Sequence, residues 1–388
     1  MRNGAAYGRY CNRVGRTADA GPCTRRRVAL SMLALAAAAL GGCDSRGEAP
    51  GAGHVRAVIG EVGASPGQFS YPRAIDVEPD GNRIWVIDKT ARVQRIDVRT
   101  GRCDAGWRMP DFEFGKPTGV TVGRWTDGRA ALYVPDTHYH RVLVYDISEI
   151  KSKPAPVLEA ESAPRLLAKI GTYGRGPGEF IYPTDVAVLP GSGSPVARLY
   201  ISEYGEHDRI NIFEPTGDAD PVNAFRFVSS FGSFGEGADP GAVEFNRPQS
   251  IAIDLDAREL IITDACNHRL GRFTLDGALI GWVGGPGTAP GRFAYPYGLV
   301  RLGDGTVLVS EYGNNRVQRI DPRTGESRGM FSQSLDGAIR ITTPWGVAVD
   351  QSEAYVLDSR SNRVIGIDVP GGPSPVAAGA GRRSGAGM

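Results

Sequence analysis

Six residues of this 388-residue chain are of the types that bind small polar ligands. They are two charged and four aromatic residues: Arg73, Asp185, Tyr204, Tyr297, Tyr312 and Trp345. Aromatic rings supply an apolar wall, and one cation and one anion can orient a polar ligand against it. These residues predict a binding site for a small polar ligand, a peptide or a protein, if the fold brings them together.

A unit that recurs six times would position these residues. Its cleanest copy, residues 295–321, has an apolar run after a proline, a second run that ends on an acid, and a third run that starts at an arginine. The opening prolines are Pro72, Pro117, Pro183, Pro248, Pro296 and Pro344. The acids are Asp88, Asp136, Glu203, Asp264, Glu311 and Asp358, and the arginines are Arg92, Arg141, Arg209, Arg269, Arg316 and Arg363. Three short strands at this spacing predict an antiparallel meander, and a repeat of about 45 residues predicts a solenoid or a propeller.

The repeat resembles the NHL repeat. The resemblance is carried by a Pro-x-Gly-Val/Ile start, a Tyr-Val-x-Asp/Glu centre and an Asn-x-Arg-Val end, and it is best at residues 264–269 and 311–316. It covers roughly residues 54–369 and implies a six-bladed β-propeller. NHL-type propellers include RNA-binding proteins, extracellular sensor domains and a zinc-dependent amidating lyase, so the resemblance implies a fold and not an activity.

The N-terminal part of the repeat region predicts how the ring closes. Residues 54–62 resemble the segments that precede other blades, while the last blade, from Pro344, has only three strands of its own. We therefore predict an all-β, six-bladed β-propeller over residues 54–370, in which the N-terminal strand completes blade six and removes an exposed edge. Residues 371–388 lack apolar periodicity and are predicted to be a disordered tail.

The first residues predict export. Three arginines, Arg25 to Arg27, precede a thirteen-residue apolar run, Val28 to Leu40, which is too short to span a bilayer but suits a signal peptide over residues 1–42. Leu40-Gly41-Gly42-Cys43 resembles a bacterial lipobox, which implies a lipid on Cys43 and a tether over residues 43–53. The alternative is an ordinary cleavage site, and the arginines are compatible with either twin-arginine or general export. The resemblance, with Asp44 after the cysteine, implies a cell-envelope protein on the periplasmic face of the inner membrane.

The charge balance argues against a nucleic-acid partner. Seven of the 44 basic residues and one of the 43 acidic residues lie in residues 1–42, which leaves 37 basic and 42 acidic residues. A mildly acidic domain without a basic stripe is unsuited to neutralising phosphates.

The six-fold repetition separates structural residues from functional ones. Features that every repeat has, such as the acid–arginine pairs, are expected to brace the fold. The residues that follow the prolines should ring the mouth of the central channel, and they differ between repeats: Arg73, Thr118, Thr184, Gln249, Tyr297 and Trp345. Their aromatic members either form a ligand-binding wall or plug the channel. Two inserted segments, residues 151–164 and 232–241, are either recognition loops or neutral additions.

No catalytic or metal site is predicted. His138, Cys266 and Asp185 come from different repeats without a ligand pattern, and His140 and His268 occupy a place where other repeats have asparagine. Cys103 and Cys266 belong to opposite blades and should not form a disulfide. The sequence therefore predicts a monomeric, non-enzymatic binding scaffold without a cofactor; the alternative is a metal-dependent propeller enzyme of the lyase or lactonase type.

Overall fold

The computed structural model describes residues 51–153, 156, 158–350 and 353–371. The predicted signal peptide, Cys43 and the predicted tail beyond residue 371 lie outside these residues. Within them, no helix has the length and apolar character needed to cross a membrane.

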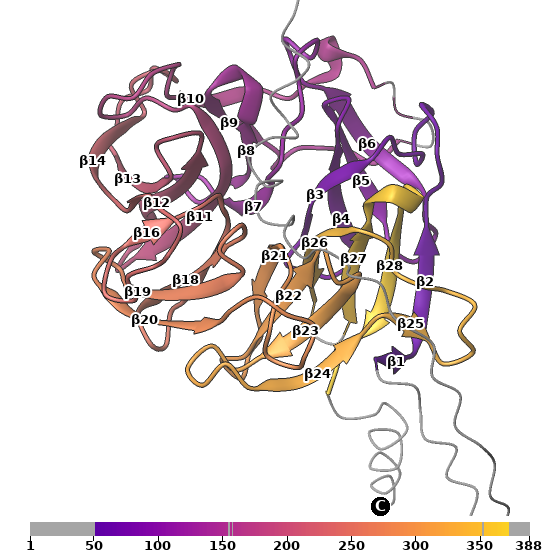
Figure 1. Cartoon of the computed structure of the whole chain (residues 1–388). Helices are drawn as coiled ribbons and strands as arrows, with labels where there is room; N and C mark the ends of the chain where they lie inside the picture. Colours follow the sequence, from indigo (N-terminus) through magenta and orange to yellow (C-terminus); the bar gives the residue numbers. More distant parts are fainter. Residues whose placement is uncertain (1–50, 154–155, 157, 351–352, 372–388) are drawn as a thin grey trace, which may run out of the picture. The chain divides into compact units, whose positions relative to one another are not determined.

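Six four-stranded antiparallel sheets are arranged around a common centre, as predicted (Figure 1). Blade one contains β3 (Pro72–Val77), β4 (Arg83–Asp88), β5 (Arg92–Asp97) and β6 (Cys103–Arg108). Blade two contains β7 (Thr121–Arg124), β8 (Ala130–Asp136), β9 (Arg141–Asp146) and β10 (Leu166–Ile170). Blade three contains β11 (Tyr182–Gly191), β12 (Ser194–Tyr204), β13 (Arg209–Pro215) and β14 (Phe225–Phe231).

The other three blades follow the same order from the centre outwards. Blade four contains β17 (Pro248–Asp254), β18 (Glu259–Asp264), β19 (Arg269–Thr274) and β20 (Leu279–Gly284). Blade five contains β21 (Pro296–Arg301), β22 (Val307–Glu311), β23 (Arg316–Ile320) and β24 (Ser327–Phe331). Blade six contains β26 (Pro344–Val349), β27 (Glu353–Asp358), β28 (Arg363–Asp368) and β2 (Val55–Ile59).

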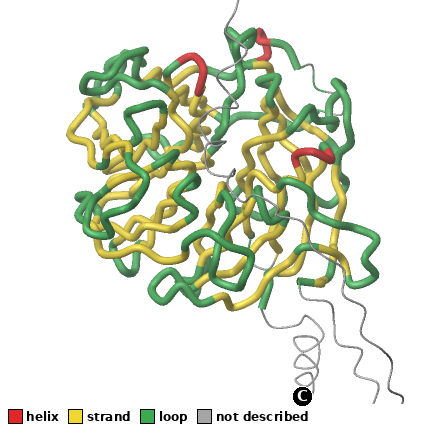
Figure 2. Tube along the Cα trace, in the orientation of Figure 1, coloured by secondary structure: helices red, strands yellow, loops and turns green. Residues whose placement is uncertain are grey.

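The remaining elements are short. Two small parallel pairs join β1 (Ala52–Gly53) to β25 (Gln333–Ser334) and β15 (Ser233–Phe234) to β16 (Glu244–Phe245). Figure 2 shows three short 3-10 helices among the strands: η1 (Thr137–Tyr139), η2 (Ala160–Ser162) and η3 (Ser359–Ser361).

The N-terminal strand closes the ring, which confirms the prediction. β2 pairs antiparallel with β28, with Val55 opposite Ile367 and Ile59 opposite Val364. Without β2, the backbone groups of β28 on that side would form an open edge. The pairing of β1 with β25 adds Ala52 and Gly53 to the ordered propeller, two residues before the predicted start.

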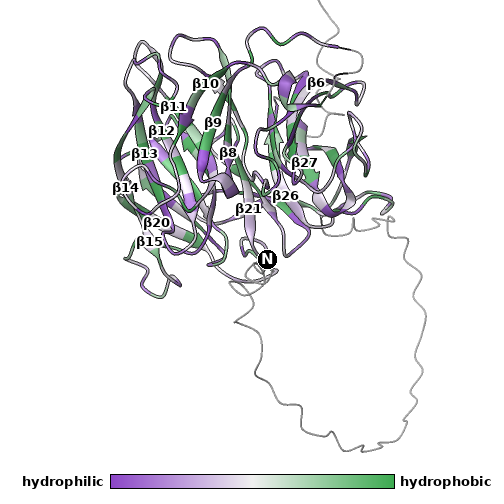
Figure 3. Ribbon diagram, turned by 90° about the horizontal axis from the view of Figure 1, so that it is seen from above, coloured by the Kyte–Doolittle hydropathy of each residue, from purple (hydrophilic) through white to green (hydrophobic). Residues whose placement is uncertain are grey.

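The hydrophobic core lies between the blades. Each of six buried clusters joins two successive blades, and the cluster of blades six and one joins Ile84 and Val86 to Tyr355 and Leu357. Apolar residues accordingly follow the strands within the sheets (Figure 3). Since a strand turns alternate side chains to its two faces, each blade contributes to two of these layers.

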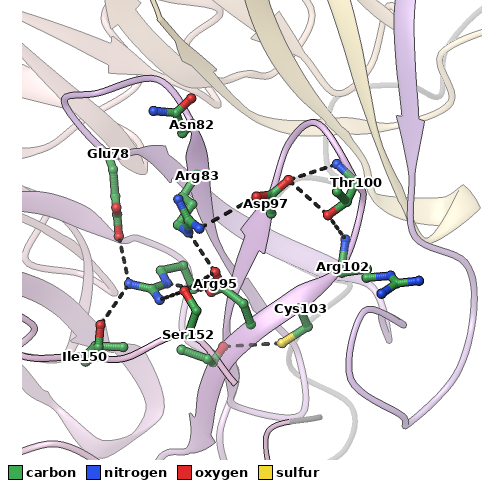
Figure 4. Close-up of polar contacts among 12 residues, drawn as sticks. Glu78, Asn82, Arg83, Arg95, Asp97, Thr100, Arg102, Cys103, Ile150 and Ser152 are labelled. Atoms are coloured by element: carbon green, nitrogen blue, oxygen red, sulfur yellow. Dashed lines mark hydrogen bonds and ion pairs between the residues drawn. The ribbon is translucent and has the colours of Figure 1, made fainter. Parts of the chain in front are cut away.

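The first inserted segment covers the outer edge of blade one. Ser152 donates through its hydroxyl to Asp104 (2.8 Å), whose carboxylate also binds Arg83 and Arg95 (both 2.7 Å); Figure 4 shows the arginines and the serine converging. The Lys153 N–H donates to the carbonyl of Asp104 (2.7 Å), in outer strand β6. This segment, between β9 and β10 of blade two, thus protects an edge strand of blade one, a structural role that the sequence did not reveal.

Candidate functional site

The inner strands of all six blades enclose a cavity of about 500 Å³. Arg73, Asp185, Tyr297 and Trp345 line it, together with Gln249. In five blades the inner strand has a register irregularity just after the opening proline of the repeat, as between Pro72 and Ala74 in β3. The predicted ring of residues after the prolines therefore forms one end of the channel wall.

The aromatic residues form a packed cluster at this end. Tyr297 and Trp345 are 6% and 7% exposed, and their ring centroids lie 4.8 Å apart. Tyr312 packs on both rings, at 5.2 Å from Tyr297 and 5.8 Å from Trp345, and Tyr71 meets the edge of Trp345 at 6.0 Å. The rings of the cluster pack on one another, and Tyr297 and Trp345 also line the cavity.

Two arginines stack on this cluster. The guanidinium carbon of Arg73 lies 4.7 Å from the ring centroid of Trp345. That of Arg247 lies 4.9 Å from Tyr204, 5.0 Å from Tyr297 and 5.9 Å from Trp345. Arg247 thus contacts the ring of Tyr204, from blade three, as well as the rings of Tyr297 and Trp345. Tyr204 and Tyr312 stand beside the residues that line the cavity.

Lys89 and Lys116 add positive charge at the same end of the channel, where His138 also lies. The ammonium nitrogen of Lys89 lies 6.0 Å from the ring centroid of Tyr71. Burial lowers the pKa of Lys116, and the charges of Arg73 and Lys89 lower it further. Burial also lowers the pKa of His138 to about 4, with contributions from Lys116 and Arg73. These groups therefore lie close enough together to repel one another.

Two carboxylates lie farther along the channel wall. Asp185 accepts bonds from the hydroxyl of Ser250 (2.7 Å) and the N–H of Ile251 (2.9 Å), both in blade four. Asp76 similarly accepts the N–H of Val122 (2.7 Å) in blade two. Burial raises the pKa of Asp185 to about 6 and that of Asp76 to about 7, where the charge of Asp185 adds to the effect. Both carboxylates connect neighbouring blades while they remain on the cavity wall.

Residues 245–273, which hold the first three strands of blade four, match the NHL repeat. The chain carries an NHL repeat in a six-bladed β-propeller. NHL repeat-containing protein 3 of Mus musculus is 31% identical over 118 residues, which are 29% of this chain and 33% of that protein. Peptidyl-glycine alpha-amidating monooxygenase of Mus musculus is 28% identical over 163 residues, which are 42% of this chain and 14% of that protein. The matches thus span a third or less of these relatives.

A solved structure supports the fold of this NHL-repeat propeller. A protein of unknown function from Bacteroides thetaiotaomicron VPI-5482 superposes with a TM-score of 0.54 at 14% identity, over 81% of this chain and 75% of that chain. At this identity, the likeness concerns the fold alone.

The repeated acids and arginines of the propeller form ion pairs, as expected. In each of the six pairs the acid is at most 1% exposed, and the charged atoms lie 2.5–2.9 Å apart. Five of the six carboxylates also accept the backbone N–H of the residue two positions before the opening proline. The pairs therefore connect the loop between the second and third strands to the entry of the first strand.

The histidines just before these arginines also connect blades, which confirms their structural interpretation. His268 accepts the N–H of Tyr295 through Nδ1 (3.0 Å), as Asn315 accepts that of Thr343 (2.8 Å). Cys103 and Cys266 do not form a disulfide with each other, as predicted. Within the described ranges, no group of three or more histidine, cysteine or acidic residues is arranged to hold a metal ion.

Arg247 and Asp76 belong to the site but were not predicted from the sequence. Arg247 stands directly before Pro248, at a position where its backbone is left-handed (φ 65°), as at Tyr71 and Tyr295. Asp76 lies four residues after Pro72, inside an alternating apolar run. The sequence contained a signal for both residues. Arg247 precedes the opening proline of blade four, where blades one and five have a tyrosine. Asp76 is an acid within an otherwise apolar stretch of an inner strand.

Proposed function

We propose that this NHL-repeat propeller is a non-enzymatic scaffold whose channel binds a small polar ligand or the polar end of a peptide or protein. The observation that carries the proposal is the cavity of about 500 Å³ lined by Arg73, Asp185, Gln249, Tyr297 and Trp345. Ligand pockets commonly have volumes of about 300–1,000 Å³ and apolar walls with a few polar groups. The repeats differ at these five positions, so the fold does not require these residue types.

The bonds of the channel carboxylates favour binding over catalysis. A general acid or base must exchange a proton with its substrate. Asp185 already accepts the hydroxyl of Ser250 and the N–H groups of Val186 and Ile251. Asp76 accepts two N–H groups, from Val77 and Val122. These bonds suit carboxylates that hold the channel wall in place.

The second candidate is a metal-dependent propeller enzyme. The partial likeness to an amidating monooxygenase, over 42% of this chain, favours it. A catalytic zinc site needs about three converging protein ligands, and the described residues contain no such donor set. Elemental analysis of the purified chain separates the two candidates, since the enzyme alternative requires a metal at one or more equivalents per chain.

The channel proposal predicts that Asp185→Asn and Trp345→Ala weaken ligand binding. Loss of a central anchor commonly costs about 2 kcal/mol, which is roughly a thirtyfold rise in Kd. The measurement is saturation-transfer NMR on the full chain with amino acids, dipeptides, monosaccharides and dicarboxylic acids. Asp185→Asn preserves the side-chain volume, whereas Trp345→Ala also removes a buried ring, so melting curves must show that each variant is folded. Trp125→Ala is the matched control, because this partly buried ring packs between blades two and three and does not line the cavity. Wild-type affinity in both site variants would refute the proposal.

The proposal includes an address in the cell envelope. The apolar segment 28–40 and the Leu-Gly-Gly-Cys sequence that follows it support cleavage before Cys43 and lipid attachment at its thiol. The propeller would then face the periplasm, held at the inner membrane by residues 43–50.

Replacement of Cys43 tests this address. Cys43→Ala should move the protein from the membrane fraction to the soluble fraction, because it removes the thiol that would carry the lipid and with it the buried acyl chain that provides the membrane affinity. Fractionation of cells that express either form gives the answer, and Cys266→Ala is the control because it removes a thiol from the propeller. Unchanged membrane association of Cys43→Ala would exclude lipid attachment at this residue.

A further inference from the structure

We propose that the end of the channel at Trp345 binds an oxyanion, a carboxylate or a phosphate, of a small ligand through Arg73, Arg247 and the indole N–H of Trp345. This inference rests on the proposed role of the channel and specifies the chemical class of its ligand.

The first argument is the arrangement of the two arginines. Their guanidinium carbons lie 4.7 Å and 5.9 Å from the ring centroid of Trp345, so both cations pack on one ring, which lines the cavity as Arg73 does. The Nε of Arg247 donates to the side-chain oxygen of Gln249 (3.1 Å), and this bond fixes the plane of its guanidinium. Planar guanidinium groups held in this way match the geometry of carboxylate and phosphate oxygens.

The second argument is an unpaired donor in the same place. The Nε1–H of Trp345 is buried and has no hydrogen-bond acceptor among the residues that the structure describes. A buried donor without an acceptor destabilises a protein, so most such groups have a partner. Trp345 lines the cavity, and a ligand oxygen there could accept this hydrogen bond.

The third argument is the accumulated positive charge. Lys116 and His138 lie close enough to Arg73 for its charge to disfavour their protonation. Asp208 accepts the N–H groups of Gly205 and Arg247, and Asp185 accepts the hydroxyl of Ser250 and the N–H of Ile251 in blade four. An oxyanion bound between the arginines would interact favourably with the positive charges of Arg73, Arg247 and Lys116, whereas a ligand cation would be repelled by them.

Four matched probes test the charge preference: benzoate, phenyl phosphate, benzamide and benzylamine. They share one ring and differ in charge, and their binding to the full chain is measured by NMR titration. We expect at least one of the two oxyanions to bind with a Kd at least about tenfold lower than benzamide, and benzylamine to bind least well. The comparison between benzoate and phenyl phosphate identifies the kind of oxyanion. Affinity should also fall as the salt concentration rises.

Three substitutions test the donors. Arg73→Gln and Arg247→Gln should each raise the Kd of the preferred oxyanion about tenfold or more, and Arg73→Lys should retain part of the affinity because it keeps the charge. Trp345→Phe keeps an aromatic ring but removes the N–H, and should raise the Kd several-fold. Arg323→Gln is the control, because Arg323 is half-exposed and pairs with Asp254 in blade four. Melting curves establish that every variant is folded.

The outcomes separate this inference from the channel proposal. If benzamide or benzylamine binds better than both oxyanions and Asp185→Asn weakens that binding, the oxyanion site is wrong and the channel proposal stands. If neither oxyanion binds at millimolar concentration, or if both glutamine variants bind them as the wild type does, the inference is overturned. If no member of the wider panel of polar compounds binds either, the channel proposal fails as well.

Discussion

A chain that lacks residues 54–62 should not form a stable monomeric propeller. This deletion removes β2, the outer strand of blade six, which pairs with β28 from Val55 to Ile59. It also removes Ile59, which is 3% exposed and packs between blades six and one with Phe69, Tyr355 and Leu357. Loss of one large buried aliphatic side chain commonly costs about 2–5 kcal/mol, which is a large part of the stability of an ordinary domain. The exposed edge of β28 would in addition favour aggregation.

Size-exclusion chromatography and thermal melting of the truncated chain test this expectation. A synthetic peptide of residues 54–62, added during refolding, should restore part of the melting transition because it can occupy the vacant edge. A peptide with the same composition in scrambled order is the control. A truncated chain that stays monomeric and melts at the wild-type temperature would show that β2 contributes little to closure of the ring.

The repeat explains why much of the fold could be predicted from the sequence. Prolines, acids and arginines at constant spacing mark the same three strands in each blade, and the ion pairs between them form in all six blades. The closing strand was also predictable, because residues 54–62 resemble segments that precede other blades. Both inferences use patterns that are local in the sequence.

The candidate site was only partly predictable, because it depends on contacts between blades. The residues after the prolines were expected at the channel, and Arg73, Tyr297 and Trp345 lie there. Arg247 was missed because its left-handed backbone and the rings of three blades together determine its position. The cover that Ser152 and Lys153 provide for blade one was missed for a similar reason, since an inserted segment carries no sign of the strand on which it packs.

Substitution of Glu311 should destabilise the propeller although Glu311 does not line the cavity. Its carboxylate is fully buried and accepts four hydrogen bonds. Oε1 accepts from Arg316 and Gln318 (both 2.6 Å), and Oε2 accepts from Asn314 (2.6 Å) and the N–H of Ala294 (3.1 Å). In Glu311→Gln, the new amide nitrogen would face two donors at either oxygen position. The buried Arg316 would also lose its counter-charge.

We expect Glu311→Gln and Arg316→Ala each to lower the free energy of unfolding by about 2–4 kcal/mol, because each leaves a buried charged group without its partner. Arg316 also donates to the carbonyls of Thr288 and Arg292, so its loss should loosen the loop before blade five. Arg328→Ala in the same blade is the control. The side chains of its pair with Glu326 are 46% and 59% exposed, and exposed pairs contribute at most about 1 kcal/mol. Urea denaturation gives the free energies.

If Glu311→Gln instead kept wild-type stability and abolished binding of benzoate or phenyl phosphate, the repeated acids would be functional rather than structural. The structure favours the structural role, because the acid of every blade is buried and bonded to its arginine in the same way.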